Sequence, residues 1–179
     1  MSFSADVKRE LAKIIPPAQH CRIVAQAVLQ YASSEGDDLA RQKYFTLVKK
    51  TSTIETLQKT ADPGSHRVPE QLLAHACCRK SLLRETFLLA GTISDPERDY
   101  HMEFQCADDA QAKQLIDVLA GFSVEARSVQ RKGHPAVYLK DSAAMVDVLN
   151  LMGAHRSLMK MENALIRKEM RNTINRQVN

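Results

Sequence analysis

The stretch "FLLAGTISDPE", Phe87 to Glu97, decides the fold of this chain. It reads as the end of an apolar helix that passes through two small residues, Ala90 and Gly91, into a tight acidic turn at Asp95. Small side chains allow two helices to approach each other closely. We therefore expect Ala90 and Gly91 at a close helix crossing, either with the helix near Ala27 or with the same helix of a second chain.

Helical and strand patterns alternate in the sequence around this stretch. The strands "TIS" and "YHMEFQC" flank the turn "DPERD", and "VEARSVQRK" and "PAVYLK" form a second hairpin across "GH". Helices are expected over residues 79–91, 109–120, 142–152 and 154–176. Alternating apolar positions indicate a sheet with one buried face, and they are Tyr100, Met102, Phe104 and Cys106. The resulting order is α-β-β-α-β-β-α, which is an α+β arrangement.

The N-terminal part repeats a fragment of this order. Helices are expected over residues 4–14, 22–33 and 39–50, and a short strand over 53–58. This reads as a degenerate half of an internal duplication that has lost the hairpin between its two helices. Prolines and a glycine in "TADPGSHRVP" indicate a linker. The predicted divisions are a first half at 1–62, a linker at 63–77, a second half at 78–153 and a C-terminal helix at 154–179.

Three blocks of the sequence resemble a known family. They are "MSFSADVKREL", "CCRKSLLRETFLLAGTISDPERDYHMEF" and "LMGAHRSLMKMENALIRKEMRNTINRQVN", and they are similar to the WhiA family of bacterial sporulation and cell-division regulators. The resemblance implies a LAGLIDADG homing-endonuclease-like fold, in which two helices pack face to face and two sheets form a saddle over DNA. The family normally continues into a helix-turn-helix domain, which this sequence does not contain. The likeness therefore implies the homing-endonuclease-like portion alone.

The acidic turn does not fit a nuclease active site. Aligning "LAGTISDP" with the nuclease motif puts Pro96 at the position of the metal-binding acid, and Asp95 falls one place early. Two-metal hydrolysis needs carboxylates that converge on the ions, and "YASSEGDD" at the end of the earlier helix offers no matching acid. We therefore expect no enzyme activity and no catalytic residue, and we interpret Asp95 as the residue that starts a turn.

The cysteines do not show the spacing of a metal site. Cys21, Cys77, Cys78 and Cys106 include an adjacent pair but no C-x-x-C. "HACC", residues 75–78, resembles half of a metal site, but no second pair of ligands has a matching spacing. Reduced, buried thiols are the expected state, and we predict no metal site and no cofactor.

Positive charge is concentrated in the C-terminal third. From Ala126 onward ten Lys or Arg face four acids, a net charge of +6, whereas the preceding residues carry a net −2. An anionic partner is therefore sought in this part of the chain. The predicted DNA-binding residues are Arg127, Arg131, Lys132 and Lys140 on the second hairpin, and Arg156, Lys160, Arg167 and Arg171 along one side of the last helix. An ordinary solvated surface is the alternative for both groups.

The last helix also carries an apolar stripe. Met159, Ile166, Met170 and Ile174 follow helical spacing and are expected to serve packing.

The resemblance and the charge distribution favour two functions. The first is a non-catalytic DNA-binding transcriptional regulator involved in cell division, chromosome segregation or sporulation, with double-stranded DNA as its partner. The second is a protein-interaction module that docks on RNA polymerase or a division protein, and a homodimer is also considered. The sequence has no apolar run of 18 residues and a charged N-terminus. We therefore expect a cytoplasmic, nucleoid-associated protein without a membrane partner.

Overall fold

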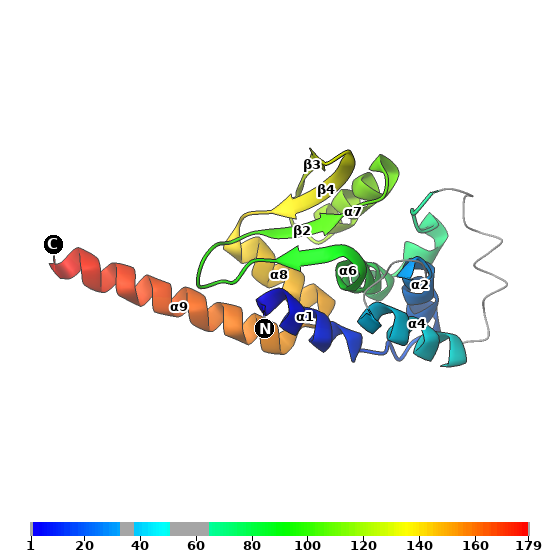
Figure 1. Cartoon of the computed structure of the whole chain (residues 1–179), viewed down its shortest axis with the longest axis horizontal. Helices are drawn as coiled ribbons and strands as arrows, with labels where there is room; N and C mark the ends of the chain where they lie inside the picture. Colours follow the sequence, from blue (N-terminus) through cyan, green and yellow to red (C-terminus); the bar gives the residue numbers. More distant parts are fainter. Residues whose placement is uncertain (1, 33–37, 51–64, 179) are drawn as a thin grey trace.

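The computed structural model describes residues 2–32, 38–50 and 65–178 (Figure 1). Its elements are α1 (Phe3–Ala12), α2 (Gln19–Leu29), α4 (Asp38–Lys50), the 3-10 helix η1 (Glu70–Leu73), α6 (Ala76–Ala90), β1 (Gly91–Ile93), β2 (Met102–Gln105), α7 (Asp109–Gly121), β3 (Arg127–Arg131), β4 (His134–Leu139), α8 (Ser142–Met152) and α9 (His155–Val178). From α6 to α8 the order is α-β-β-α-β-β-α, which confirms the prediction. The strand expected over 53–58 lies outside the described residues.

Four antiparallel strands form one sheet in the order β1-β2-β4-β3. Met102 pairs with Leu139, and Phe104 pairs with Val137. These four side chains are buried and share the face that packs against α6 and α7. Phe87 on α6 meets Phe104 edge to face, with the ring centroids 5.6 Å apart. The alternation of apolar residues in β2 therefore places the core as expected.

Short acidic side chains start the helices that follow the strands. Asp108 accepts a hydrogen bond of 2.7 Å from the N–H of Gln111 at the start of α7. Asp141 does the same for Ala144 at the start of α8, at 3.1 Å. Gly153 ends α8 with a left-handed backbone, φ +86°, which glycine adopts without steric cost. The chain can therefore reverse sharply into α9.

Helix α2 packs extensively against α6 and joins the N-terminal part of the chain to the rest. Val24 and Val28 of α2 share the main core with Leu82 and Leu83 of α6. A second, smaller cluster lies on another side of the pair and includes Ala25, Leu29, Ala40, Leu47 and Leu88. Of the two partners expected for α6, the helix near Ala27 is therefore the one that packs against it in this chain.

The position predicted for Gly91 in this pairing is wrong. Helix α6 ends at Ala90, and Gly91 is the first residue of β1. The atoms nearest to the place where a Cβ would sit belong to Phe87 of the same helix, and the closest is Cδ2 at 2.3 Å. Glycine is therefore needed because the chain leaves the helix over the Phe87 ring, and not because α2 approaches it.

A buried ion pair ties α4 to α6. Lys43 Nζ lies 2.7 Å from Glu85 Oε1 and donates a second hydrogen bond of 2.9 Å to the carbonyl of Leu11 in α1. Both charged side chains are almost fully excluded from solvent. Burial raises the pKa of Glu85 and lowers the pKa of Lys43, while their mutual attraction opposes both changes. Three helices therefore meet at one polar contact.

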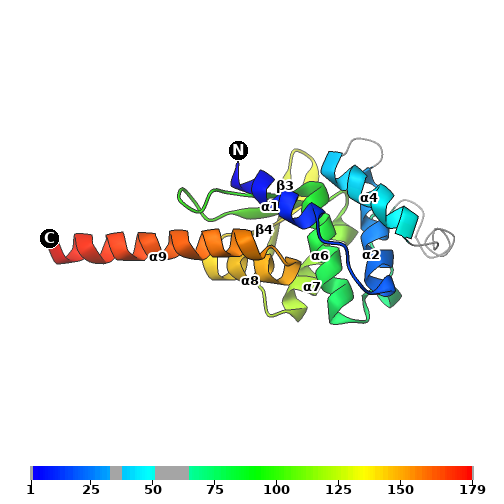
Figure 2. The same ribbon diagram turned by 90° about the horizontal axis from the view of Figure 1, so that it is seen from below.

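Helix α9 begins against α1 and α8 and then extends away from the body (Figures 1 and 2). Its buried residues, Ser157, Met161 and Ala164, all lie in its first half. The packing role predicted for the apolar stripe is wrong, because each of its four side chains is more than half exposed: Met159, Ile166, Met170 and Ile174. None of the described helices is long and apolar enough to cross a bilayer.

We expect Gly91→Ala to lower the free energy of unfolding by about 1–3 kcal/mol through overpacking. A Cβ would lie 2.3 Å from Phe87 Cδ2 and 2.7 Å from Phe87 Cα, so the backbone itself must shift. Gly121→Ala is the matched control, because among the described residues nothing lies within 4 Å of its new methyl group. Urea denaturation measures both variants, and equal stability of the two would contradict this account.

We expect Glu85→Ala to cost about 3–5 kcal/mol, because it leaves the Lys43 ammonium buried without its counter-charge. The double variant Glu85→Leu with Lys43→Met removes both charges and should recover most of the lost stability. Asp117→Ala breaks the exposed pair with Lys113, 3.2 Å apart, and serves as the control. It should change stability by less than about 1 kcal/mol. A Glu85→Ala protein as stable as the Asp117→Ala protein would refute the role of the buried pair.

Candidate nucleic-acid interface

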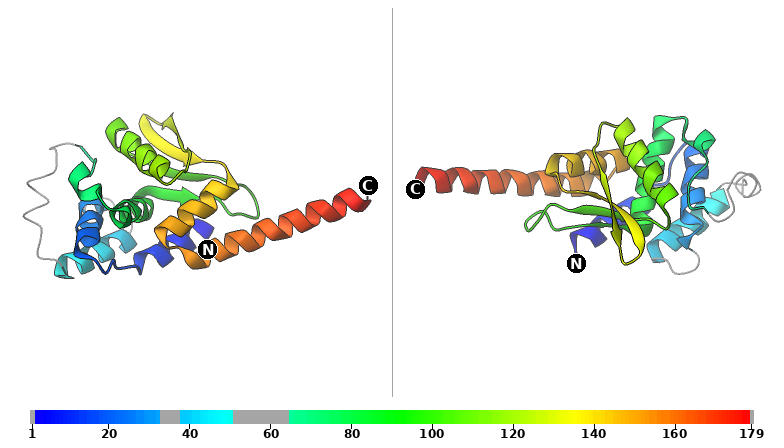
Figure 3. Two further views of the ribbon diagram at one scale, coloured as in Figure 1. Left: turned by 180° about the vertical axis from the view of Figure 1, so that it is seen from behind. Right: turned by 90° about the horizontal axis from the view of Figure 1, so that it is seen from above.

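One face of the sheet lies opposite the face that packs against α6 and α7, although Glu103 and Ala136 on it are buried. Because successive residues of a strand point to opposite faces, the register assigns alternate residues of each strand to it. We call it the open face, and its side chains are Thr92, Glu103, Gln105, Arg127, Val129, Arg131, His134, Ala136 and Tyr138. Figure 3 shows the two hairpins that form it side by side.

Two of the predicted DNA-binding residues, Arg127 and Arg131, lie on the open face. Arg127 is opposite Tyr138 in the ladder, and Arg131 is opposite His134. Both arginines belong to β3, the edge strand, whose five residues are all exposed. Their shared strand parity therefore places both guanidinium groups on the same accessible surface.

The two predicted lysines of this hairpin lie at the ends of β4. Lys132 forms the turn with Gly133, and both residues have a left-handed backbone, at φ +51° and +81°. Lys140 follows the strand, and its Nζ lies 5.5 Å from the centroid of the Tyr138 ring on the open face. The structure therefore brings Arg127, Arg131 and Lys140 to one face and puts Lys132 at its turn.

A carboxylate on the open face contacts two neighbouring basic side chains. Glu103 Oε2 lies 2.9 Å from Arg131 Nε and 2.9 Å from His101 Nε2, and its side chain is only 9% exposed. The His101 ring stacks with Tyr138 at a centroid distance of 6.0 Å. Sequence reasoning missed His101, Glu103 and Tyr138 as parts of this surface. The signal was available, because His101, Glu103 and Gln105 alternate with the buried residues of β2.

A hollow of about 690 Å³ borders this surface. Arg131, Lys132 and His134 line it from the hairpin, and Tyr31 and His66 line it from the segments that follow α2 and precede η1. The rings of Tyr31 and His66 are 4.0 Å apart and brace each other. The cations of the hairpin turn therefore face a recess and not a flat surface.

The predicted cations of α9 are placed differently. Lys160 Nζ lies 3.3 Å from Asp6 of α1. Arg167 donates from Nε to Glu97 at 3.1 Å, and Arg171 lies 3.3 Å from the same carboxylate in the β1–β2 loop. Hydrogen bonding from Lys160 holds the pKa of Asp6 below its usual value, and Arg167 has the same effect on the pKa of Glu97. These three cations therefore serve to dock α9 on the body.

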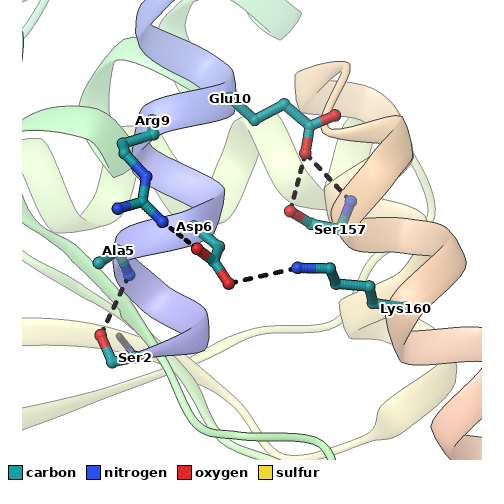
Figure 4. Close-up of polar contacts among 7 residues, drawn as sticks. All are labelled: Ser2, Ala5, Asp6, Arg9, Glu10, Ser157 and Lys160. Atoms are coloured by element: carbon teal, nitrogen blue, oxygen red, sulfur yellow. Dashed lines mark hydrogen bonds and ion pairs between the residues drawn. The ribbon is translucent and has the colours of Figure 1, made fainter.

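Figure 4 shows the base of this docking. Glu10 of α1 accepts hydrogen bonds from the backbone N–H groups of Arg156 and Ser157, at 2.7 and 3.0 Å, and from the Ser157 hydroxyl at 2.8 Å. The Arg156 backbone is thus held by a carboxylate from another helix that caps the first turn of α9. The structure therefore separates the eight predicted residues into two groups, one on the sheet and one on α9.

The acidic turn that follows β1 is built as expected. Asp95 Oδ1 accepts a hydrogen bond of 3.0 Å from the N–H of Glu97, and the Asp95 carbonyl accepts from Arg98 and Asp99 at 2.9 and 3.1 Å. The Asp95 side chain therefore stabilises its own turn. Among the described residues, the cluster of four side chains that offers metal ligands does not include Asp95.

Comparisons with known proteins match this architecture. The family model described as the WhiA LAGLIDADG-like domain matches residues 79–171. A protein of Lachnoclostridium phytofermentans named "Probable cell division protein WhiA" is 35% identical over 230 aligned positions, which cover the whole chain and 74% of that protein. A protein of the same name from Caldicellulosiruptor saccharolyticus is 43% identical over 143 residues, or 80% of this chain and 42% of the relative. The first alignment is longer than this chain, so that relative contains segments without a counterpart here.

Two solved structures share the fold. Full-length DUF199/WhiA from Thermatoga maritima superposes with a TM-score of 0.71 at 16% identity, covering 99% of this chain and 73% of that one. The N-terminal LAGLIDADG domain of DUF199/WhiA superposes with a TM-score of 0.62 at 19% identity, covering 85% of this chain and 92% of that one. The fold, the family model and the sequence identity agree, and the chain belongs to the WhiA family.

Proposed function

We propose that this chain is a non-catalytic DNA-binding protein that acts in bacterial cell division. The observation that carries the proposal is the shared orientation of Arg127 and Arg131 on an exposed edge strand, beside Lys132 in the turn. A guanidinium group donates hydrogen bonds in a fork that matches phosphate oxygens, so this strand suits the DNA backbone. The role in cell division follows the names of the relatives.

The distribution of charge supports contact through the C-terminal third of the chain. The residues before Ala126 carry a net charge of −2 and repel phosphates at long range. On α9, Lys160, Arg167 and Arg171 already face Asp6 and Glu97. DNA would have to displace those carboxylates before it gained new contacts. On the hairpin, Arg131 likewise faces Glu103, and Arg127 lies 3.9 Å from Glu125. The preference for the hairpin therefore rests on the shared orientation of its cations on an exposed strand.

We infer that the protein acts on DNA as a regulator and not as a nuclease. Asp95 is the acid nearest to the nuclease position in the sequence, and its carboxylate is engaged in the turn. Transcription control in cell division, chromosome segregation or sporulation, at the nucleoid in the cytoplasm, is the cellular role that we propose. Backbone contacts of this kind position a protein on DNA without reading the sequence of bases.

One observation favours a second candidate, an interaction module that docks on RNA polymerase or a division protein. The four residues of the apolar stripe on α9 are each at least 55% exposed. An amphipathic helix of this kind fits an apolar groove on a partner protein. In this alternative the basic hairpin is an ordinary solvated surface.

Replacing Arg127, Arg131 and Lys132 with Ala should weaken binding to random duplex DNA. Each lost phosphate contact should lower the slope of log affinity against log salt by about one unit, similarly for every sequence. The matched variant replaces Arg156, Lys160, Arg167 and Arg171 with Ala, and it should have the smaller effect. Fluorescence anisotropy at several salt concentrations measures both.

Two results of that experiment would refute the proposed surface. If the α9 variant loses binding and the hairpin variant keeps it, the open face is not the interface. If the parent chain does not bind duplex DNA at low salt, the interaction module is the better account.

Removing the buried charge of Glu103 should strengthen DNA binding. Glu103→Gln keeps the shape of the side chain but releases Arg131 from a carboxylate 2.9 Å away. Arg131, the partner of Glu103, is half exposed, so the charge is partly screened and contributes up to about 1 kcal/mol; we expect about a two- to fivefold gain in affinity. Glu162→Gln on α9 changes the net charge equally and should leave affinity within experimental error. Equal gains for both variants would show that only net charge matters.

A further inference from the structure

Four potential metal ligands converge where α2 and α6 begin. His20 and Cys21 are the second and third residues of α2, and Cys77 and Cys78 are the second and third residues of α6. One ring nitrogen and three sulfur atoms all lie within 4.8 Å of one another. The second pair of ligands that the sequence spacing did not reveal is therefore supplied by another helix.

The nitrogen–sulfur distances within this cluster are close to those of a tetrahedral site. His20 Nδ1 lies 3.1 Å from Cys78 Sγ, 3.4 Å from Cys21 Sγ and 3.9 Å from Cys77 Sγ. Bonds of about 2.3 Å to sulfur and 2.0 Å to nitrogen around one zinc ion put neighbouring ligand atoms roughly 3.5–3.8 Å apart. The three nitrogen–sulfur distances lie within about 0.4 Å of this range, and all four atoms lie within 4.8 Å of one another, so shifts of up to about 1 Å bring them onto one ion.

We propose that His20, Cys21, Cys77 and Cys78 bind one Zn²⁺ ion in tetrahedral coordination. Thiolate and imidazole ligands favour zinc over magnesium or calcium, which prefer oxygen. Four protein ligands fill the coordination sphere, as in structural zinc sites, and leave no position for a reacting water. The ion would join the starts of α2 and α6 and would not take part in a reaction.

The ends of the two helices favour thiolate ligands. Neither Ala18 before α2 nor His75 before α6 makes a side-chain cap. The first-turn N–H groups of both helices therefore receive no hydrogen bond from the side chain of the preceding residue. The positive ends of two helix dipoles therefore meet at the cluster and stabilise negative charge there. A zinc ion with three thiolates and a neutral imidazole has a net charge of −1, which this environment accommodates.

Zinc binds cysteine as the thiolate, so binding releases the thiol protons. Burial and the neighbouring thiols raise the pKa of Cys21 to about 12, and burial also raises the pKa of Cys78. Zinc binding replaces these protons, so affinity should increase with pH. The neighbouring backbone is already held, because Ser81 Oγ donates to the Cys21 carbonyl at 3.1 Å and Cys78 N–H donates to the His75 carbonyl at 3.1 Å.

The cluster is accessible from one side. Cys21 and Cys78 are buried, whereas His20 and Cys77 are exposed. A metal ion can therefore enter from solvent past His20 and Cys77 and reach the buried pair. The same exposure makes His20 and Cys77 suitable for substitution, since the core does not depend on them.

The test uses the whole chain, reduced and freed of metal with a chelator. Titration with Co²⁺ should give the visible absorption of tetrahedral cobalt and a thiolate charge-transfer band, with saturation at one ion per chain. Zn²⁺ should displace the cobalt and raise the thermal midpoint, because binding to the folded state alone stabilises it. Competition with a colorimetric chelator gives the zinc affinity.

Substitutions separate the cluster from other thiols and imidazoles. His20→Ala combined with Cys77→Ser should lower zinc affinity more than about 100-fold, since even outer-shell changes cost ten- to 100-fold at metal sites. Cys106→Ser removes the remaining cysteine, which is buried elsewhere, and should bind like the parent. His75→Asn removes the ring 5.1 Å from His20 and should also bind like the parent.

Three results would overturn the proposal. They are saturation at less than one ion per chain in the reduced parent, equal zinc affinity in the parent and the His20→Ala/Cys77→Ser variant, and an octahedral cobalt spectrum. A fourth result would also contradict it: a disulfide between α2 and α6 in the isolated protein, with no zinc uptake after reduction. The cluster would then be a redox-active cysteine pair and not a metal site. None of these results depends on DNA binding.

Discussion

The packing of α2 against α6 is the constraint on which the rest of the structure depends. Helix α6 leads directly into β1, so its placement fixes the first strand and, through the ladder, the whole sheet. The main core and the smaller cluster both take side chains from this helix pair. The Lys43–Glu85 ion pair then adds α4 and α1 to α6. Removing one partner of a buried ion pair leaves the other charge uncompensated, so the contact also resists any arrangement that separates these helices.

The second half of the fold was predictable because its signals are local. Period-two alternation identified β2, and turn residues located both hairpins. The parity of Arg127 and Arg131 was enough to place both on one face of the sheet. The turn role of Asp95 also followed from its position before Pro96. Each of these inferences needs only the neighbours of a residue along the chain.

The remaining features depend on contacts between distant segments, which no local pattern encodes. Cys21 and Cys78 are far apart in sequence and meet only because two helices begin at the same place. The cations of α9 have the spacing of a free basic stripe, yet Asp6 and Glu97 reach them from other elements. The stripe at Met159 and Ile166 has the spacing of a packed face, but both side chains are more than half exposed. Likewise, the need for glycine at position 91 comes from the Phe87 ring, one turn earlier in the chain, and not from a second helix.

The long helix α9 projects from the body as a stiff rod. A helix of 24 residues spans about 36 Å at 1.5 Å per residue, and its described carboxylate attachments at Asp6, Glu10 and Glu97 leave its final turns free of those contacts. Because an α-helix is stiff, a tilt of a few degrees at the base displaces the tip by several times the shift at Glu10. A change in the direction of α9 at its attachments would therefore move its last turns farthest.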